Sequence, residues 1–460
     1  MFEFQAPAMP LTPALRPVAA AALLAVVAAG CSASPSATPS PSAAPGDTAV
    51  PAPVLRPPYA PGWSAVHADA RNSDYAAAPV AADLALAWST RLEAGQQLGP
   101  LPWSINLGPT LGPGGGLYVT STAPGCHLRA LDAATGELRW CAPFIDALAV
   151  VSSPTVDLDG ALYLADGAGL HAISPDGSER WRVPLEGVPL SLQFTPDGRL
   201  VFVTNIGVVY LVDRLSGSVL GEPLRLAPGL SWRPADGLWA CARGVEGCPS
   251  ANTLAVDPAS GTIYFTFWAP GAPAAGLRAM RYRPGQSPAF EPLWENDSLP
   301  GGTASSPALS FDGRRLYVTD NQGSLHAIDA ATGRAAWSLP IGYPADGSAS
   351  VSPEGLIIPA GGRGGWVLAV RDEGDRGVLA WERRDLPNRG VVMQAAGGRA
   401  YAAIAAGDYR LELVVLDARD GAELDREVLP GQGVFSVGTT AALDGTVFVA
   451  TITGWLAALR

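Results

Sequence analysis

The chain has 460 residues, of which 53 are glycine and 43 are proline, whereas only 16% are charged. This composition favours many short strands and tight turns over amphipathic helices. The net charge is −12, and all 30 basic residues are arginine. A Walker-type phosphate loop, a Schiff base and a Ser-Lys dyad each need a lysine ammonium group, so the sequence excludes them. The acidic balance, without an arginine-rich stripe interleaved with aromatic residues, also argues against a nucleic-acid partner.

Residues 1–30 have the pattern of an export signal. An apolar run over residues 18–30 follows Arg16, is too short to span a bilayer comfortably, and ends in small residues just before Cys31. The pattern resembles a bacterial lipoprotein signal, which implies cleavage before Cys31 and lipid on its thiol and amino group. Plain secretion with cleavage elsewhere is the alternative.

Residues 31–61 read as a disordered tether. They are mostly Ser, Ala, Pro and Thr with almost no charge, so they cannot bury a core. At roughly 3 Å per residue in an extended form, such a tether holds a folded body several tens of ångströms from a membrane. We assign residues 62–460 to the folded body.

Two segments of this body are nearly identical, ALDAATGELRW from Ala130 and AIDAATGRAAW from Ala327. Both follow the pattern A-x-D-x-x-T-G-x-x-x-W. The aspartate can fold its carboxylate onto turn amides, and the glycine can adopt a positive φ. The small alanine lets a neighbouring sheet approach, and the tryptophan is large enough to fill the wedge between two sheets.

Weaker copies of this pattern bring the total to seven. The others begin at Ala172, Leu211, Ala279, Ala369 and Val415. Most copies follow a hairpin signal in which a glycine-containing turn leads to an alternating aromatic strand. The spacing of 41 residues from Trp140 to Trp181 and of 44 from Trp337 to Trp381 suits a propeller of four-stranded blades.

The two ends of the body complement each other. Residues 84–90 have the pattern of a fourth strand without a preceding hairpin, and a last hairpin beginning at Leu443 has no fourth strand. Their pairing closes a ring and leaves no free sheet edge. The repeat resembles the tryptophan-docking motif of quinoprotein propellers, the pyrroloquinoline-quinone-like repeat. We therefore predict an all-β, eight-bladed β-propeller, whose docking residues are Trp88, Trp140, Trp181, Trp294, Trp337 and Trp381.

Four cysteines remain after Cys31, an even number in an exported chain, which indicates two disulfides. Cys126 and Cys141 flank the first docking hairpin. Cys241 and Cys248 bracket a short loop in the fourth blade, where about 30 residues exceed the length of one blade. The alternative is a metal site, but the spacing lacks paired C-x-x-C elements.

The sequence presents no catalytic constellation and no metal-binding motif. The four histidines include His171 and His326, which occupy the same position of the repeat. Their equivalence indicates a role in blade structure. No G-x-S-x-G elbow and no evident acid–base pair occurs, so we predict neither catalytic residues nor a metal site.

The resemblance to quinoprotein propellers implies one face on which a ligand sits. In the dehydrogenases of this family that face holds pyrroloquinoline quinone and calcium, and the alcohol oxidisers often have adjacent cysteines, which this chain lacks. Residues on turns between second and third strands, or on neighbouring loops, are the candidate ligand contacts, although solvated turn residues are the preferred explanation. They are Asp166, Asn205, Trp232, Asp320, Asn321 and Arg389.

Three functions remain open. The first is a monomeric, non-enzymatic scaffold that binds an envelope protein, similar in architecture to the BamB-type lipoproteins of outer-membrane barrel assembly. The second is an oxidoreductase of alcohols or sugars that uses pyrroloquinoline quinone with calcium. The third is a propeller that senses glycans or small ligands, for which Trp232 and Trp239 give slight support.

Overall fold

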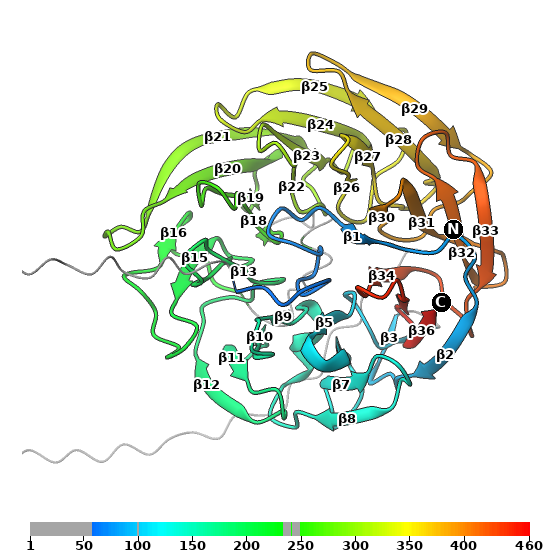
Figure 1. The fold of residues 1–460 in the computed structure, drawn as a ribbon. Helices are drawn as coiled ribbons and strands as arrows, with labels where there is room; N and C mark the ends of the chain where they lie inside the picture. The colour runs from blue at the N-terminus through cyan, green and yellow to red at the C-terminus, as the bar shows by residue number, and fades with distance from the viewer. Residues whose placement is uncertain (1–57, 99–100, 233–240, 242–248) are drawn as a thin grey trace, which may run out of the picture. The chain divides into compact units, whose positions relative to one another are not determined.

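The computed structural model describes residues 58–98, 101–232, 241 and 249–460. Viewed face on in Figure 1, the strands form eight blades around a common axis. This arrangement confirms the predicted all-β, eight-bladed β-propeller. The expected signal peptide, the lipidation site Cys31 and most of the tether lie outside the described residues.

The four strands of each blade are antiparallel, and in blades 1 to 7 they follow chain order from the inside of the ring to the outside. The strands of blade 1 are β5 (Thr110–Gly112), β6 (Gly116–Thr120), β7 (Leu128–Asp132) and β8 (Leu138–Cys141). Those of blade 2 are β9 (Thr155–Val156), β10 (Leu162–Ala165), β11 (Leu170–Ile173) and β12 (Glu179–Val183). Those of blade 3 are β13 (Gln193–Phe194), β14 (Leu200–Val203), β15 (Val208–Val212) and β16 (Leu224–Arg225).

The inner strand of blade 4 is split into two short segments that both pair with β19. The strands of blade 4 are β17 (Ser250–Ala251), β18 (Ala255–Val256), β19 (Ile263–Trp268), β20 (Ala274–Tyr282) and β21 (Phe290–Pro300). Those of blade 5 are β22 (Ala308–Leu309), β23 (Arg315–Thr319), β24 (Ser324–Asp329) and β25 (Ala335–Pro340). Those of blade 6 are β26 (Ser350–Val351), β27 (Leu356–Ile358), β28 (Val367–Asp372) and β29 (Gly377–Arg383).

Blade 7 gains an extra strand, β1 (Tyr75–Pro79), which pairs in parallel with its inner strand. Its other strands are β30 (Met393–Ala396), β31 (Arg399–Ala405), β32 (Leu411–Asp417) and β33 (Glu423–Val428). Outside the blades lie the hairpin β3 (Gln96–Leu98) and β4 (Leu101–Trp103), and two short 3-10 helices, η1 (Pro113–Gly115) and η2 (Ala147–Val151).

Blade 8 is built from both ends of the folded body, as the sequence predicts. Its inner strands are β34 (Ser436–Ala441), β35 (Val447–Thr451) and β36 (Trp455–Leu459), and its outer strand is β2 (Leu86–Arg91). In Figure 1 the blue β2 lies beside the red β36. The register places Ser89 opposite Ala457 and Thr90 opposite Leu456.

Each docking tryptophan packs on the turn between the third and fourth strands of the next blade. The ring of Trp88 in blade 8 lies over Gly136 of blade 1, and its Nε1 donates to the carbonyl of Ala133 at 3.1 Å. The rings of the other five tryptophans lie in the same way over Gly177, Gly217, Gly333, Gly377 and Gly421. Large aromatic surfaces therefore fill the wedges between blades.

Two junctions between described strands lack this tryptophan. Blade 3 has Gly221 at the matching position, and its junction with blade 4 is filled by an apolar cluster that includes Leu224 and Phe290. At the corresponding position blade 7 has Asp425, whose Oδ2 accepts a hydrogen bond from the amide of Leu84 at 2.7 Å.

The segment before β1 crosses the centre of the ring, where Figure 1 shows it in dark blue. Its carbonyls accept hydrogen bonds from amides at the ends of the inner strands of six blades. The donors are Leu111, Val156, Val256, Leu309, Val351 and Gln394. This lead-in segment, residues 58–74, begins with Pro58, whose carbonyl accepts from the amide of Leu158 at 2.7 Å. It therefore ties nearly the whole ring together from within.

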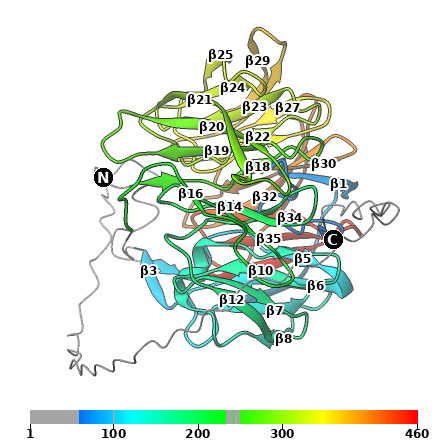
Figure 2. The same ribbon diagram turned by 90° about the vertical axis from the view of Figure 1, so that its left-hand side faces the viewer.

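The antiparallel topology gives the ring two distinct faces. The turn face carries the turns between first and second strands and between third and fourth strands, and the lead-in segment lies at this face. The loop face carries the turns between second and third strands and the loops between blades. Figure 2 shows the ring from the side, with β3 on one side and β1 on the other. None of the helical segments in the described ranges is long and apolar enough to cross a membrane.

Candidate functional site

Asp166 starts the turn between β10 and β11 on the loop face. Its Oδ1 accepts hydrogen bonds from the amides of Ala168 (2.7 Å) and Gly169 (3.0 Å), and its Oδ2 accepts one from the amide of Asp146 (3.0 Å). Nε2 of His171 lies 3.0 Å from Oδ1. Burial by itself raises the pKa of Asp166, but these hydrogen bonds outweigh it, so the pKa falls below its ordinary value. The carboxylate thus holds its own turn in place.

Asp320 repeats this arrangement in blade 5. Its Oδ1 accepts hydrogen bonds from the amides of Gln322 and Ser324, both at 2.9 Å, and its Oδ2 lies 2.8 Å from Nε2 of His326. Burial raises the pKa of Asp320, and the hydrogen bonds from His326 and the turn amides lower it by more. The equivalent histidines of the repeat therefore serve the same turn in two blades.

The amides Asn205 and Asn321 are also held by backbone groups. Oδ1 of Asn205 accepts a hydrogen bond from the amide of Val188 at 2.9 Å, and Nδ2 of Asn321 donates to the carbonyl of Gly301 at 2.7 Å. Trp232 packs beside Val188 in a small apolar cluster above blades 1 to 3. Nδ2 of Asn205 and Nε1 of Trp232 are buried and have no hydrogen-bond partner among the described residues.

Arg389 lies at the loop before blade 7 and lines a hollow of about 180 Å³ between blades 7 and 8. Its Nη1 donates to the carbonyls of Gly362 (3.0 Å) and Asn388 (2.9 Å). Tyr409 and Arg410 line the same hollow. Sequence reasoning missed these two residues, because they follow a glycine and an aspartate that indicate only a turn.

The predicted ligand contacts thus lie on the expected face, but on different parts of the ring. Asp166 belongs to blade 2, Asn205 to blade 3, Asp320 and Asn321 to blade 5, and Arg389 to the loop before blade 7. Their contact with a ligand stays a prediction.

Asp166 and Asp320 are the two carboxylates among the candidate ligand contacts. Calcium needs about six to eight oxygen ligands, carboxylates foremost. The carboxylates of Asp166 and Asp320 are already engaged by turn amides and histidines. Throughout the ranges that the structure describes, no three His, Cys, Asp or Glu side chains gather where they could hold a metal ion.

The inner ends of neighbouring blades are joined by small hydroxyl side chains. Oγ of Ser153 donates to the carbonyl of Gly108 at 2.9 Å, and the amide of Ser153 donates to Oγ of Ser191 at 3.2 Å. On the opposite side, the amide of Ser306 donates to Oγ of Ser348 at 3.1 Å. The hydroxyls of Ser153, Ser191 and Ser348 therefore form contacts between blades.

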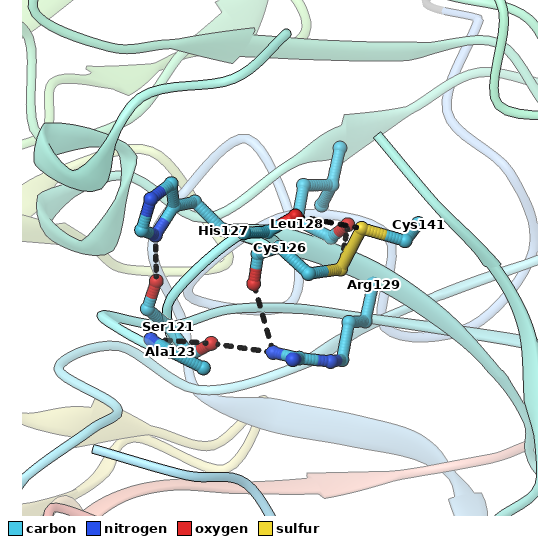
Figure 3. The surroundings of a disulfide bond; sticks show 8 residues. Ser121, Ala123, Cys126, His127, Leu128, Arg129 and Cys141 are labelled. Carbon is cyan, nitrogen blue, oxygen red and sulfur yellow. Dashed lines mark hydrogen bonds between the residues drawn. A yellow bond between two sulfur atoms is a disulfide. The ribbon is translucent and has the colours of Figure 1, made fainter. Parts of the chain in front are cut away.

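The disulfide predicted in blade 1 is formed. Cys126 and Cys141 lie 5.8 Å apart at their Cα atoms and join β8 to the loop before β7 (Figure 3). Nη1 of Arg129 donates to the carbonyl of Cys126 and to Oγ of Ser121, which fixes the same loop. Cys241 is buried and disulfide-bonded. Cys248, its expected partner, lies outside the described residues.

The family model described as outer membrane protein assembly factor BamB matches residues 76–223, 126–267 and 290–459. The chain belongs to this family. Proteins similar to this chain include Protein Rv3035 of Mycobacterium tuberculosis, which is 32% identical over 86% of this chain and 95% of that protein. The outer membrane protein assembly factor BamB of Burkholderia pseudomallei is 24% identical over 67% of this chain and 73% of that protein.

Solved structures of this family and of quinoproteins share the fold. BamB from Moraxella catarrhalis superposes with a TM-score of 0.56 at 18% identity and covers 82% of this chain and 100% of that one. Quinohemoprotein alcohol dehydrogenase from Comamonas testosteroni superposes with a TM-score of 0.59 at 15% identity and covers 87% of this chain and 80% of that one. At such identities the likeness shows the fold alone, because one propeller architecture serves unrelated functions.

Proposed function

We propose that the chain is an exported, lipid-anchored envelope protein that acts as a non-enzymatic binding or assembly scaffold. The main support is the use of the candidate side chains on the loop face. Asp166 and Asp320, the carboxylates best placed to hold a cofactor, are tied to their own turns. A broad face whose polar groups stabilise the fold suits recognition of another protein better than chemistry on a small substrate.

The point at which the lead-in segment enters the ring also supports this proposal. The carbonyl of Pro58 is bound by Leu158 at the turn face, and the ring of Pro58 lies near Gly198 of blade 3. Pro58, the first residue of the lead-in segment, therefore lies at the turn face. An anchor attached from that side leaves the loop face free for a partner.

Membership of a family described as an assembly factor favours a protein partner. Affinity capture from envelope extracts, with the full chain as bait, tests this directly. We expect recovery of a discrete envelope protein and a defect of envelope assembly in a deletion strain. Failure to recover any partner, together with normal envelope assembly in that strain, contradicts the proposal.

The dehydrogenase alternative has its own test. The purified protein is titrated with pyrroloquinoline quinone and calcium while absorbance and dye reduction with alcohols and sugars are followed. We expect no saturable absorbance change and no dye reduction. Saturable binding of the quinone, together with dye reduction that depends on an alcohol or sugar, would favour the dehydrogenase over the scaffold.

Lipid attachment is tested separately by mass spectrometry of the mature protein from its native cells. We expect an acylated N-terminal Cys31. An unmodified mature N-terminus excludes the anchor, and the scaffold function then applies to a secreted protein.

A further inference from the structure

The hollow between blades 7 and 8 has features of a ligand site. It opens on the loop face, has a volume of about 180 Å³, and is lined by Arg389, Asp408, Tyr409 and Arg410. Leu411 and other apolar residues complete its lining. The side chain of Tyr409 is 56% exposed at this point. The hollow is therefore lined by two arginines, an aspartate, an exposed tyrosine and several small or apolar residues.

Backbone hydrogen bonds hold the segments that form the hollow. The amide of Gly433 donates to the carbonyl of Tyr409 at 2.6 Å, which joins the turn of blade 7 to the loop before blade 8. The amide of Arg389 donates to the carbonyl of Ala403 at 2.8 Å, and the amide of Ser436 donates to the carbonyl of Arg389 at 2.6 Å. The fold thus holds the segments of the hollow in place, so a ligand that binds there loses little free energy to ordering them.

The charge of the hollow is opposite to that of the chain. The chain carries a net charge of −12, whereas the lining has two arginines and one aspartate. Many arginines of the molecule pair with carboxylates, as Arg426 does with Glu423 at 2.9 Å. Within the described ranges, no carboxylate forms an ion pair with Arg389 or Arg410. Nη1 of Arg389 donates to two backbone carbonyls, so the guanidinium of Arg410 is the more available of the two to an anion.

We propose that this hollow binds the C-terminal carboxylate of a polypeptide whose last side chain is apolar. Arginine binds carboxylates through paired, charge-assisted hydrogen bonds, which accounts for the two guanidinium groups. The apolar wall fits the last side chain. Sites for drug-sized ligands have volumes of about 300 to 1,000 Å³, so this smaller hollow suits a single terminal residue. The choice of a polypeptide over a small carboxylate rests on the proposed scaffold function.

The test uses a fluorescein-labelled octapeptide that ends in phenylalanine, prepared as free acid and as C-terminal amide, and measured by fluorescence anisotropy with the full chain. We expect the free acid to bind at least about tenfold more tightly than the amide, because a charge-assisted bond is lost. Arg389→Gln and Arg410→Gln each weaken binding of the free acid by a similar factor. Arg363→Gln, which removes an exposed arginine of the same face outside the hollow, leaves it unchanged.

Equal affinity for acid and amide, or wild-type affinity in both arginine variants, overturns the proposal. Arg410 is exposed, and its guanidinium forms no ion pair among the described residues, so its variant tests binding even if Arg389→Gln perturbs the fold. N-acetylphenylalanine is the competitor that separates the two sources of carboxylate. Competition at the affinity of the octapeptide assigns the hollow to a small carboxylate and overturns the peptide assignment; much weaker competition supports it.

Capture from envelope extracts by the wild-type chain and by the double arginine variant separates this inference from the scaffold function. A partner captured equally by both, without peptide binding, overturns the inference and leaves the scaffold function standing. Peptide binding without any captured partner supports the inference about the hollow and contradicts the scaffold function. Capture by the wild-type chain alone supports both.

Discussion

The glycine of the first docking turn meets two requirements at one position. Gly136 has a φ of +75°, in the region that side chains rarely adopt, and a Cβ added to it would lie 2.5 Å from the ring of Trp88. Gly221 has the same φ of +75° but nothing within 4 Å of its added Cβ. A comparison of the two glycines therefore distinguishes the cost of backbone strain, which both positions share, from the cost of a clash with a tryptophan ring, which only Gly136 has.

We predict that Gly136→Ala lowers the free energy of unfolding more than Gly221→Ala does. Backbone strain alone costs about 1 to 2 kcal/mol in either variant. The contact with Trp88 adds about 1 to 3 kcal/mol in the first. Urea denaturation of both variants measures the difference, and equal losses would show that the tryptophan does not require the close approach.

His171 is a buried histidine held between two carboxylates. Its Nδ1 lies 2.7 Å from Oε1 of Glu179, and its Nε2 lies 3.0 Å from Oδ1 of Asp166. Burial lowers the pKa of the imidazole, but the hydrogen bonds and charges of the two carboxylates raise it by more, so the pKa lies above its ordinary value. The folded state therefore favours the protonated ring.

This shift gives a signed pH dependence. A pKa that is higher in the folded than in the unfolded state adds stability that is fully present below about pH 6.5 and is lost as the pH rises through the folded pKa. We predict that His171→Gln lowers the free energy of unfolding more at about pH 6 than at about pH 9. His127→Gln, which changes a histidine bound to a backbone carbonyl, is the control. A pH-independent effect of His171→Gln contradicts the assignment.

At the scale of elements, β2 closes the ring and also supplies the tryptophan that docks on blade 1. It pairs with β36 along its length, and Trp88 packs on the first docking turn. Its removal leaves a free edge on β36 and an unfilled wedge at the junction of blades 8 and 1.

We predict that deletion of residues 80–92 abolishes the cooperative thermal transition or causes aggregation. Scanning calorimetry and size-exclusion chromatography measure the outcome. A chain that begins at residue 55 is the control, because it keeps the lead-in segment and β2. Unchanged melting of the deletion variant would rule out the closure.

The disulfide of blade 1 stabilises a single element. It joins residues 15 positions apart and ties the loop before β7 to the outer strand β8. The Cys126→Ser, Cys141→Ser double variant is expected to lose about 3 kcal/mol of unfolding free energy, because the unfolded chain is no longer cross-linked. Urea denaturation tests this, with the reduced wild-type protein as a comparison. A loss near zero would mean that hydrogen bonds of Arg129 alone hold the loop.

At the scale of the molecule, the sequence repeat predicts the fold but does not predict the candidate site. The docking motif at Ala130 and Ala327 fixes the turn, the glycine and the tryptophan together, so blade number and closure follow from spacing. The hydrogen-bond partners of Asp166 cannot be predicted from the spacing. One of them, the amide of Asp146, comes from a loop between blades that has no repeated sequence pattern. The hollow depends on three segments that meet only when blades 7 and 8 pack.

The lead-in segment shows the same limit. The sequence places the start of the folded body at residue 62, but the contacts with blades 2 and 3 begin at Pro58 and Tyr59. The carbonyls of the segment accept these hydrogen bonds, and every residue has a backbone carbonyl whatever its side chain. The side-chain sequence therefore does not indicate the contacts. The passage of the segment across the ring could therefore be found only from the structure.

The central proposal is that a protein partner binds the loop face while the chain joins its anchor at the turn face. The most direct measurement is photo-crosslinking in intact cells, with benzoylphenylalanine in place of Tyr409 on the loop face or of Leu215 on the turn face. These side chains are 56% and 63% exposed, so access is matched. We predict a discrete adduct with an envelope protein from position 409 and none from position 215. An adduct from position 215 alone, or from neither, contradicts the proposal.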